Sequence, residues 1–226
     1  MNTKLETYFD DEALRRASRL DTATISDALD HHGLAGQCRS IMPASTGFRL
    51  TGRAWTLLYG PAGTPPGTVG DYIDDLGPNT VVVLDNRGRT DATVWGDILT
   101  EIAARKGLAG TVIDGINRDV SLCLELDYPI YSRGHWMRTG KDRVQVEATQ
   151  VPVSIGEVRI SPGDILRGDA DGVVAIPKLH EEAVLATAEQ IQATEDAIRA
   201  AVREGLSLRE AREKYGYHRL QTRSPN

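Results

Sequence analysis

Cysteine and phenylalanine are scarce in this sequence, with two copies of each among 226 residues. The two cysteines, Cys38 and Cys123, lie far apart and form no CxxC pair, which argues against a zinc site or a disulfide framework. We expect each cysteine to be a small buried apolar side chain. Because valine, isoleucine, leucine and alanine are common instead, the composition favours aliphatic α/β packing over an aromatic-rich β-sandwich.

Long apolar runs and basic stripes are also missing. No stretch approaches the roughly 20 apolar residues of a membrane span, and residues 1–16 lack the apolar core of a signal peptide, so we expect a cytoplasmic protein. The formal net charge is −6, and the most basic segment, 138–143, is interrupted by Asp142, so no nucleic-acid partner is expected. The segment 60–70 is rich in glycine and proline, but no lysine follows it as in a P-loop.

The middle of the chain predicts a strand, a helix and a second strand. Residues 80–85 and 109–114 are apolar runs typical of strands that are buried on both faces. Between them, residues 97–105 have the apolar periodicity of a helix, which should end near Gly107. Strand, helix and strand at this spacing form a βαβ unit, in which the two strands run parallel.

The flanking regions predict further helices and an antiparallel sheet. Helices are expected over residues 10–20, over 24–32 with Ser26 or Asp27 near the start, over 179–203, and from the capping box at 207–210. Short strands are expected at 51–59, 129–132, 144–146, 151–153, 157–160 and 171–176, with tight turns at 163–164 and 168–169. The length allows one compact domain with a full core, which we place at residues 1–205, followed by a helical extension at 206–226.

Polar residues gather where the two predicted parallel strands end, and ligands bind at that edge of such units. Asp97 lies at the start of the intervening helix, and Asp119 follows the second strand. Both offer the hard carboxylate oxygens that Mg²⁺ or Mn²⁺ prefers. No lysine is placed to form a Schiff base, so a metal ion should act as the electron sink.

The same segments offer groups for a small anion. The free amides of Ile98 and Leu99 at the helix start can hold a carboxylate. Arg118 can bind a carboxylate or stabilise an enolate. The alternative is structural, with Arg118 and Asp119 forming a common salt bridge and Asp97 only capping the helix. Residue types and spacing leave both interpretations open.

Asp97, followed after 20 residues by Arg118 and Asp119, resembles the signature of the class II 4-hydroxy-4-methyl-2-oxoglutarate/4-carboxy-4-hydroxy-2-oxoadipate aldolases. These enzymes share a fold with RraA, the regulator of ribonuclease E activity A. The resemblance runs from about residue 20 to about residue 180 and includes the segments 22–29, 52–54, 95–97, 110–119 and 169–177. The fold it implies is α/β, a layered β/β/α swivelling-type domain with one parallel and one antiparallel sheet.

The resemblance also implies a role for each residue of the motif. Asp119 would be the direct ligand of Mg²⁺ or Mn²⁺, and Asp97 would hold a metal-bound water. Arg118 would bind the 2-oxo acid and steady its enolate. The substrate carboxylate would lie against the start of the helix, at Gly96, Asp97 and the amides of Ile98 and Leu99.

The function implied by this resemblance is that of a divalent-metal-dependent lyase. It would cleave a 4-hydroxy-2-oxo acid to pyruvate through a metal-stabilised enolate and would decarboxylate oxaloacetate as a side reaction. Family members form homotrimers or homohexamers, and a carboxylate from a neighbouring chain, here Glu195 or Asp196, could complete the site. The alternative is a non-catalytic regulator of ribonuclease E that acts through protein contacts. Asp97 argues against it, because a pure regulator needs no water-holding carboxylate there.

Some other polar residues have a structural interpretation beside a functional one. His135 and Trp136 could reach the substrate from a loop. Arg87 and Arg89 could pair with a second substrate carboxylate, although an ordinary surface role is simpler. Asp169 is expected to fix a turn rather than to bind metal.

Overall fold

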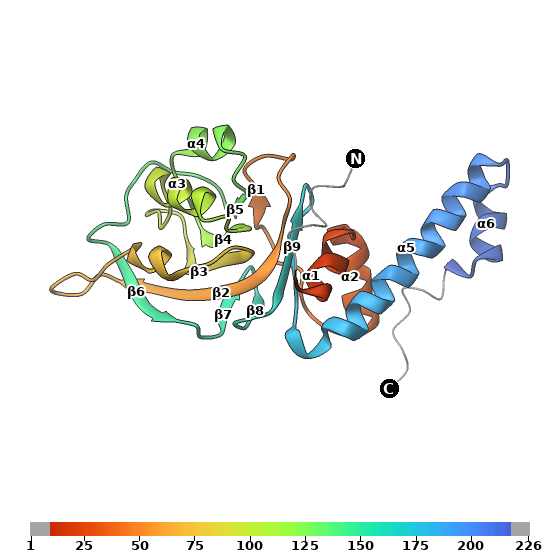
Figure 1. Ribbon diagram of the computed structural model, residues 1–226, viewed down its shortest axis with the longest axis horizontal. Helices are drawn as coiled ribbons and strands as arrows, with labels where there is room; N and C mark the ends of the chain where they lie inside the picture. The colour runs from red at the N-terminus through yellow and green to blue at the C-terminus, as the bar shows by residue number, and fades with distance from the viewer. Residues whose placement is uncertain (1–9, 218–226) are drawn as a thin grey trace.

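One mixed sheet forms the body of the chain, which the computed structural model describes from residue 10 to residue 217 (Figure 1). The strands are β1 (Met42–Pro43), β2 (Leu50–Pro61), β3 (Thr80–Arg89), β4 (Gly110–Gly115), β5 (Ile130–Ser132), β6 (Val144–Thr149), β7 (Val153–Ile155), β8 (Val158–Ile160), β9 (Ile165–Asp169) and β10 (Gly172–Ile176). The order in the eight-stranded sheet is β1-β5-β4-β3-β2-β9-β10, with β6 also paired to β2, and β7 and β8 form a separate hairpin. The edge strands β1 and β10 lie next to each other, so the sheet is nearly closed.

The parallel and antiparallel parts predicted from the sequence are both present, joined in the same sheet. Strands β2, β3, β4 and β5 run parallel in the middle. Strands β1, β6, β9 and β10 pair with their neighbours in the antiparallel sense. The prediction of a mixed α/β fold with C-terminal helices is therefore confirmed.

Helices cover the sheet in two groups. They are α1 (Glu12–Ser18), α2 (Thr22–His31), α3 (Asp97–Arg105), α4 (Val120–Glu125), α5 (Glu181–Arg203) and α6 (Leu208–Lys214), with 3₁₀ turns η1 (Asp71–Asp75) and η2 (Lys178–His180). Helices α3 and α4 lie together beside the parallel strands, whereas α1 and α2 pack against the β9–β10 end and against α5 (Figure 1). The bounds of α3 are the predicted ones. Among the described helices, none is long and apolar enough to cross a membrane.

Two hydrophobic cores hold these layers together. The larger core contains the apolar runs of β3 and β4, where side chains such as Val82, Leu84 and Ile113 are fully buried beneath α3. The smaller core joins α1, α2 and α5 to Ile165 of β9 and Val174 of β10. Because strands β3 and β4 are buried on both faces, their positions are fixed, and so is the edge at which they end.

Helix α2 begins at Thr22, two residues before the predicted range 24–32, so Ser26 and Asp27 lie inside the helix and do not cap its start. Its N-cap is Asp21, whose side chain accepts a hydrogen bond from the Thr24 amide at 2.7 Å. Asp169 of β9 also accepts hydrogen bonds from the amide and the hydroxyl of Thr22, at 2.8 and 2.7 Å. This second contact joins residues far apart in the sequence and so has no local signal.

The predicted tight turn at residues 168–169 was also wrong, because both residues belong to strand β9. The turn between β9 and β10 lies at residues 170–171, where Asp169 accepts a hydrogen bond from the Asp171 amide at 3.0 Å. Asp169 thus fixes this turn, as expected. Gly168 has a packing role instead, since a Cβ there would lie 2.8 Å from the ring of Tyr131.

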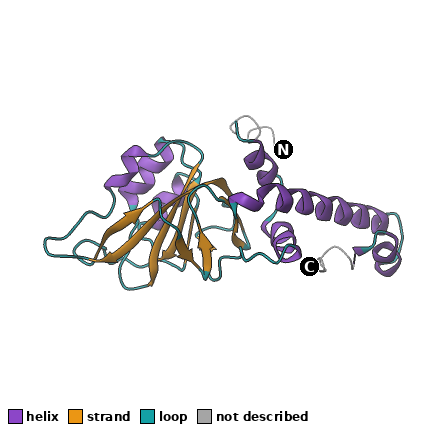
Figure 2. Cartoon of the chain, turned by 90° about the horizontal axis from the view of Figure 1, so that it is seen from below, coloured by secondary structure: helices purple, strands orange, loops and turns teal. Residues whose placement is uncertain are grey.

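Helix α5 runs beyond the sheet and carries α6 on its outer end (Figure 2). The predicted capping box at the start of α6 is present, with Ser207 and Glu210 each accepting from the backbone of the other. A small third core joins α5 and α6 around Ile198, Ala201 and Ala211. Helix α6 therefore lies within the segment 206–226 that was predicted to be a helical extension. Residues 218–226, like residues 1–9 of the predicted domain, lie outside the described residues.

Candidate functional site

The entry into helix α3 is fixed by a buried tryptophan. Trp95 is 2 % exposed, and its indole nitrogen donates to the Thr100 hydroxyl at 2.9 Å. That hydroxyl in turn donates to the Gly96 carbonyl oxygen at 3.0 Å. Gly96 is the N-cap residue of α3, so Asp97 stands at the first helical position, where the helix presents free backbone amides.

The segment after β4 is clamped from two sides. The Arg118 amide donates to the Trp95 carbonyl at 3.0 Å, which ties the segment to the start of α3. On the other side, the Asn117 amide donates to Gly134 at 3.2 Å and the Trp136 amide donates to the Asn117 carbonyl at 3.0 Å. Asp119 then adopts a left-handed backbone conformation with φ of 58° as the N-cap of α4. These contacts hold Arg118 and Asp119 beside the first turn of α3.

The motif residues meet at this point. The Asp97 amide donates to Asp119 Oδ2 at 3.1 Å, and Arg118 Nε lies 3.3 Å from the same oxygen. The side chains of Arg118 and Asp119 are each 38 % exposed. An ion pair this exposed stabilises a fold by less than about 1 kcal/mol. Stabilisation of the fold by this ion pair is therefore too small to explain why Arg118 and Asp119 are held in so constrained an arrangement.

Of the two amides in the predicted carboxylate cradle, one already has a partner within the chain. The Ile98 amide donates to Asp97 Oδ1 at 2.8 Å, so it would have to exchange that partner for a bound anion. The Leu99 amide lies in the first helical turn, where no intrahelical acceptor is available. The positive end of the helix dipole therefore points to the place where the Arg118 guanidinium lies.

Gly96 is needed for the close approach of the motif side chains. A Cβ at this position would lie 2.8 Å from Asp119 Oδ2 and 3.2 Å from Arg118 Nε. Its backbone is extended, with φ of −148°, so side-chain space rather than backbone conformation is what requires glycine.

The variant Gly96→Ala is expected to displace both side chains. We expect its affinity for Mg²⁺ or Mn²⁺ to fall about tenfold, a typical cost of disturbing a group that orients a metal ligand, without loss of the fold. Calorimetric metal titration checks this, with Gly77→Ala as the control because a Cβ at Gly77 meets nothing within 4 Å. Equal metal affinity in the two variants would show that the close approach at Gly96 is unimportant.

Two hollows flank Arg118. One, of about 180 Å³, lies between the start of α3, Val69–Gly70 and residues 139–141. The other, of about 410 Å³, is bounded by Arg118, Asp119, Val120 and the loop residues His135, Trp136 and Met137. Apolar residues make up much of both walls; Asp97, Arg118 and Lys141 are the charged residues of the first, and Arg118 and Asp119 are those of the second. The structure thus places His135 and Trp136 beside the motif, as the sequence allowed.

The carboxylates of Asp97 and Asp119 are the side chains at this site that could bind a metal ion. Among residues 10–217, no group of three or more His, Cys, Asp or Glu side chains could hold a metal ion by itself. That donor set does not fit zinc, which takes three or four protein ligands. It fits Mg²⁺ or Mn²⁺, since such ions keep several waters and are held by one or two carboxylates together with substrate oxygens. Asp119, partly exposed and placed by a strained backbone, is the better placed of the two.

Asp85 lies within strand β3, which continues past the predicted end to Arg89, and Asp114 is next to the last residue of β4; neither joins this site. Asp85 accepts hydrogen bonds from the amides of Arg87 and Ser154, at 2.8 and 3.0 Å. Asp114 accepts from the Gly156 amide at 2.8 Å and from the Arg133 guanidinium at 2.5 Å. Both carboxylates therefore hold the β7–β8 hairpin across the end of the sheet.

Asp114→Ala is expected to lower the free energy of unfolding by about 3 kcal/mol, because a buried amide and a guanidinium lose their charged acceptor. Urea unfolding of Asp114→Ala against the wild type measures the change. Asp75→Ala, at an exposed position in η1, is the control and should stay within about 0.5 kcal/mol. A similar small change in Asp114→Ala would contradict the structural role.

The remaining candidate charges have ordinary partners. Arg87 pairs with Glu147 and Arg89 pairs with Asp91, each at 2.9 Å, in agreement with the surface role. Glu195 and Asp196 both pair with Arg199 on α5, which lies away from α3 in this chain (Figure 1). Their part in a neighbouring chain's site, like the trimer or hexamer itself, stays a prediction.

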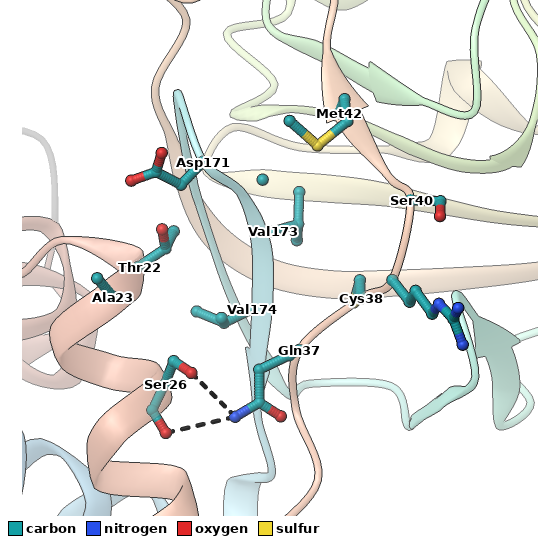
Figure 3. A pocket seen from close by; sticks show the side chains of 12 residues that line it. Thr22, Ala23, Ser26, Gln37, Cys38, Ser40, Met42, Asp171, Val173 and Val174 are labelled. Carbon is teal, nitrogen blue, oxygen red and sulfur yellow. Dashed lines mark hydrogen bonds between the residues drawn. The ribbon is translucent and has the colours of Figure 1, made fainter.

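A further pocket of about 390 Å³ lies between α2, residues 37–42 and strand β10 (Figure 3). In its wall, the side-chain amide of Gln37 donates hydrogen bonds to the backbone carbonyl oxygen of Ser26 at 3.3 Å and to the Ser26 hydroxyl at 3.1 Å. Cys38 also lines it, but burial raises the pKa of this thiol to about 12, so it is no nucleophile near neutral pH. Both Cys38 and Cys123 are buried free thiols, as expected.

The chain is similar in sequence to several known proteins. Protein DlpA of Legionella pneumophila is 40 % identical over 207 residues, which cover 90 % of this chain but 34 % of that protein. The chain therefore spans about a third of the length of this relative. A Halalkalibacterium halodurans protein named "Putative 4-hydroxy-4-methyl-2-oxoglutarate aldolase" is 34 % identical over 83 % of this chain and 87 % of its own.

A solved structure extends the comparison to the fold. RraAS2 of Streptomyces coelicolor, described as an unusual member of the RNase ES inhibitor RraA protein family, superposes with a TM-score of 0.77. It is 28 % identical and covers 84 % of this chain and 97 % of its own. The family model RraA-like, described as Aldolase/RraA, matches residues 22–175, which include every residue of the motif. The chain is therefore a member of the RraA-like (Aldolase/RraA) family.

Proposed function

We propose that this protein is a divalent-metal-dependent lyase that cleaves a 4-hydroxy-2-oxo acid to release pyruvate and also decarboxylates oxaloacetate. The observation that carries the proposal is the meeting of Asp97, Arg118 and Asp119 at the N-terminus of α3. The aldolase name of the Halalkalibacterium halodurans relative supports it.

The proposed metal site is made by Asp119, with Asp97 next to it. A bound Mg²⁺ or Mn²⁺ would supply a Lewis acid that polarises the 2-oxo group of the substrate. The left-handed backbone at Asp119 and the hydrogen bond from the Asp97 amide fix the direction of its carboxylate. A metal ion that is held by so few protein groups needs a carboxylate whose direction is fixed in this way.

Arg118 and the helix start would bind the acid end of the substrate. The Leu99 amide and the α3 dipole favour the C1 carboxylate at the helix N-terminus. The Arg118 guanidinium can donate to the 2-oxo oxygen, where negative charge develops in the transition state. A cation held beside that oxygen lowers the barrier because it is already oriented when the charge appears.

Asp97 would assist removal of the proton from the C4 hydroxyl of the substrate. Its exposed carboxylate can hold the water that takes the proton from the C4 hydroxyl. The C3–C4 bond then breaks, its electron pair forms the pyruvate enolate, and C4 leaves as a carbonyl. Protonation at C3 completes pyruvate. Oxaloacetate would lose CO₂ from C3 to give the same enolate, without needing the C4 hydroxyl.

A coupled assay for pyruvate tests the proposal. The purified chain is mixed with oxaloacetate or with 4-hydroxy-4-methyl-2-oxoglutarate, in Mg²⁺ or in chelator. We expect pyruvate from both substrates in Mg²⁺ and none above the buffer control in chelator. No pyruvate from either substrate, with metal demonstrably bound, would contradict the proposed substrate class.

The second candidate is a non-catalytic regulator of ribonuclease E, which the similarity to RraAS2 favours. Exposed apolar side chains near the site, namely Ile98, Trp136 and Met137, would suit protein contacts. Absence of both metal binding and pyruvate formation would favour this function, and inhibition of ribonuclease E cleavage by the chain would establish it.

A further inference from the structure

Two side chains that can move protons lie on different sides of Arg118. The Arg118 side chain belongs to the walls of both hollows described above. Asp97 lines the smaller of these hollows, and His135 lines the larger one, of about 410 Å³. Protonation of the pyruvate enolate at C3, the last step of the proposed reaction, needs a proton donor close to Arg118. His135 is a candidate for this donor because Asp97 already serves the C4 hydroxyl.

The backbone at His135 is fixed by Asn117, a residue that is only 1 % exposed. The Asn117 amide donates to the Gly134 carbonyl oxygen at 3.2 Å, and the Trp136 amide donates to the Asn117 carbonyl oxygen at 3.0 Å. These two hydrogen bonds make a parallel bridge between Asn117 and His135. Since Asn117 directly precedes Arg118 in the chain, the bridge holds the histidine beside the motif.

The imidazole ring of His135 is free to turn towards a bound molecule. It is exposed, and it forms no hydrogen bond or ion pair with the residues from 10 to 217. Histidine is the side chain that both gives and takes protons near neutral pH. Trp136 and Met137, its neighbours in the wall of the hollow, exchange no protons. His135 is therefore the residue of this loop that can act as an acid or a base.

The planar enolate of pyruvate can receive a proton at C3 from either of its two faces. In the proposed function Arg118 holds this enolate, and Arg118 borders both hollows. The water held by Asp97 acts on the C4 hydroxyl, so it works on the face from which C4 leaves. His135 lines the other hollow and can therefore reach C3 from the opposite face.

We propose that His135 is the catalytic residue that protonates the pyruvate enolate at C3. The protonated imidazole gives its N–H proton to C3, the electron pair of the enolate forms the new C–H bond, and the C2 oxygen becomes a carbonyl again. The neutral imidazole then takes a proton from water. In the reverse direction, neutral His135 removes a methyl proton from bound pyruvate. This assignment rests on the proposed function and adds the proton donor that completes it.

Two reactions in Mg²⁺ test His135→Ala. Loss of CO₂ from oxaloacetate forms the enolate without proton transfer at C3, whereas exchange of the pyruvate methyl protons for deuterium requires that transfer. We expect the ratio of the exchange rate to the rate of oxaloacetate loss to fall roughly 10²- to 10⁴-fold, the usual contribution of a positioned acid–base group. Added imidazole should restore part of the exchange, because the ring that it replaces is exposed in an open hollow. His180→Ala, at an exposed histidine before α5, should keep the wild-type ratio.

The outcomes separate this assignment from the proposed function. A ratio that stays at the wild-type value in His135→Ala, whether both reactions keep their rates or slow equally, would overturn His135 as the proton donor and leave the lyase in place. A wild type that neither consumes oxaloacetate nor exchanges the methyl protons would reject the lyase and the proton donor together.

Discussion

Asp119→Asn is expected to lose metal binding and metal-dependent pyruvate formation while the fold is retained. Asparagine has the size of aspartate and tolerates the left-handed backbone at this position, where φ is 58°. The substitution therefore removes the negative charge with little strain. Because loss of a group that only orients a ligand weakens metal binding about 10- to 100-fold, loss of the ligand charge itself should weaken it more than about 100-fold. Calorimetric titration with Mn²⁺ measures the affinity directly.

A matched control is available at the other end of helix α4. Asp127 is also an aspartate in the left-handed conformation, with φ of 50°, and it follows the C-cap of α4. Asp127→Asn should bind Mn²⁺ and form pyruvate as the wild type does. Unchanged metal affinity in Asp119→Asn would remove Asp119 from the metal site and leave it only structural contacts, with Arg118 and with the Asp97 amide.

Arg118→Ala should lower kcat for pyruvate formation by roughly 10²- to 10³-fold, the usual cost of removing one preorganised donor to a developing negative charge. Metal affinity should change little, because Asp119 and not Arg118 holds the ion in this proposal. Arg118→Lys keeps the charge but not the planar donor pair, so it should recover part of the lost rate. Steady-state kinetics with oxaloacetate compares the three proteins.

Arg105→Ala is the control for this loss, since Arg105 is an exposed arginine at the far end of α3. It should leave kcat unchanged. A kcat in Arg118→Ala within about threefold of the wild-type value would show that this guanidinium does not stabilise the transition state.

The fold was predictable where local signals were strong. Helix α3 has a clear apolar periodicity and ends before Gly107, whose φ of 67° is typical of a helix C-terminus. Strands β3 and β4 are buried on both faces and read as continuous apolar runs. Because parallel strands end at the same edge, the sequence also placed Asp97 and Asp119 in one region, and the structure brings them into contact.

The rest depended on contacts between distant parts of the chain. Asp114 is the last residue of a predicted strand, yet its carboxylate accepts a hydrogen bond from the amide of Gly156, 42 residues away. Gly168 looked like a turn residue, yet it makes room for Tyr131. Lys141 carried no signal at all, because only the contact of its loop with Thr93 brings it beside Arg118. Helix α4 is six residues long, too short for a periodic pattern.

The most direct measurement is the exchange of the methyl protons of pyruvate for deuterium, followed by proton NMR in D₂O. Forming the enolate from the product requires removal of a C3 proton, so this exchange reports the central chemical step without any assumption about the natural substrate. The proposed function predicts exchange that needs Mg²⁺, stops when chelator is added and is lost in Arg118→Ala. Pyruvate that keeps its methyl protons in the presence of the metal-loaded wild type would contradict it.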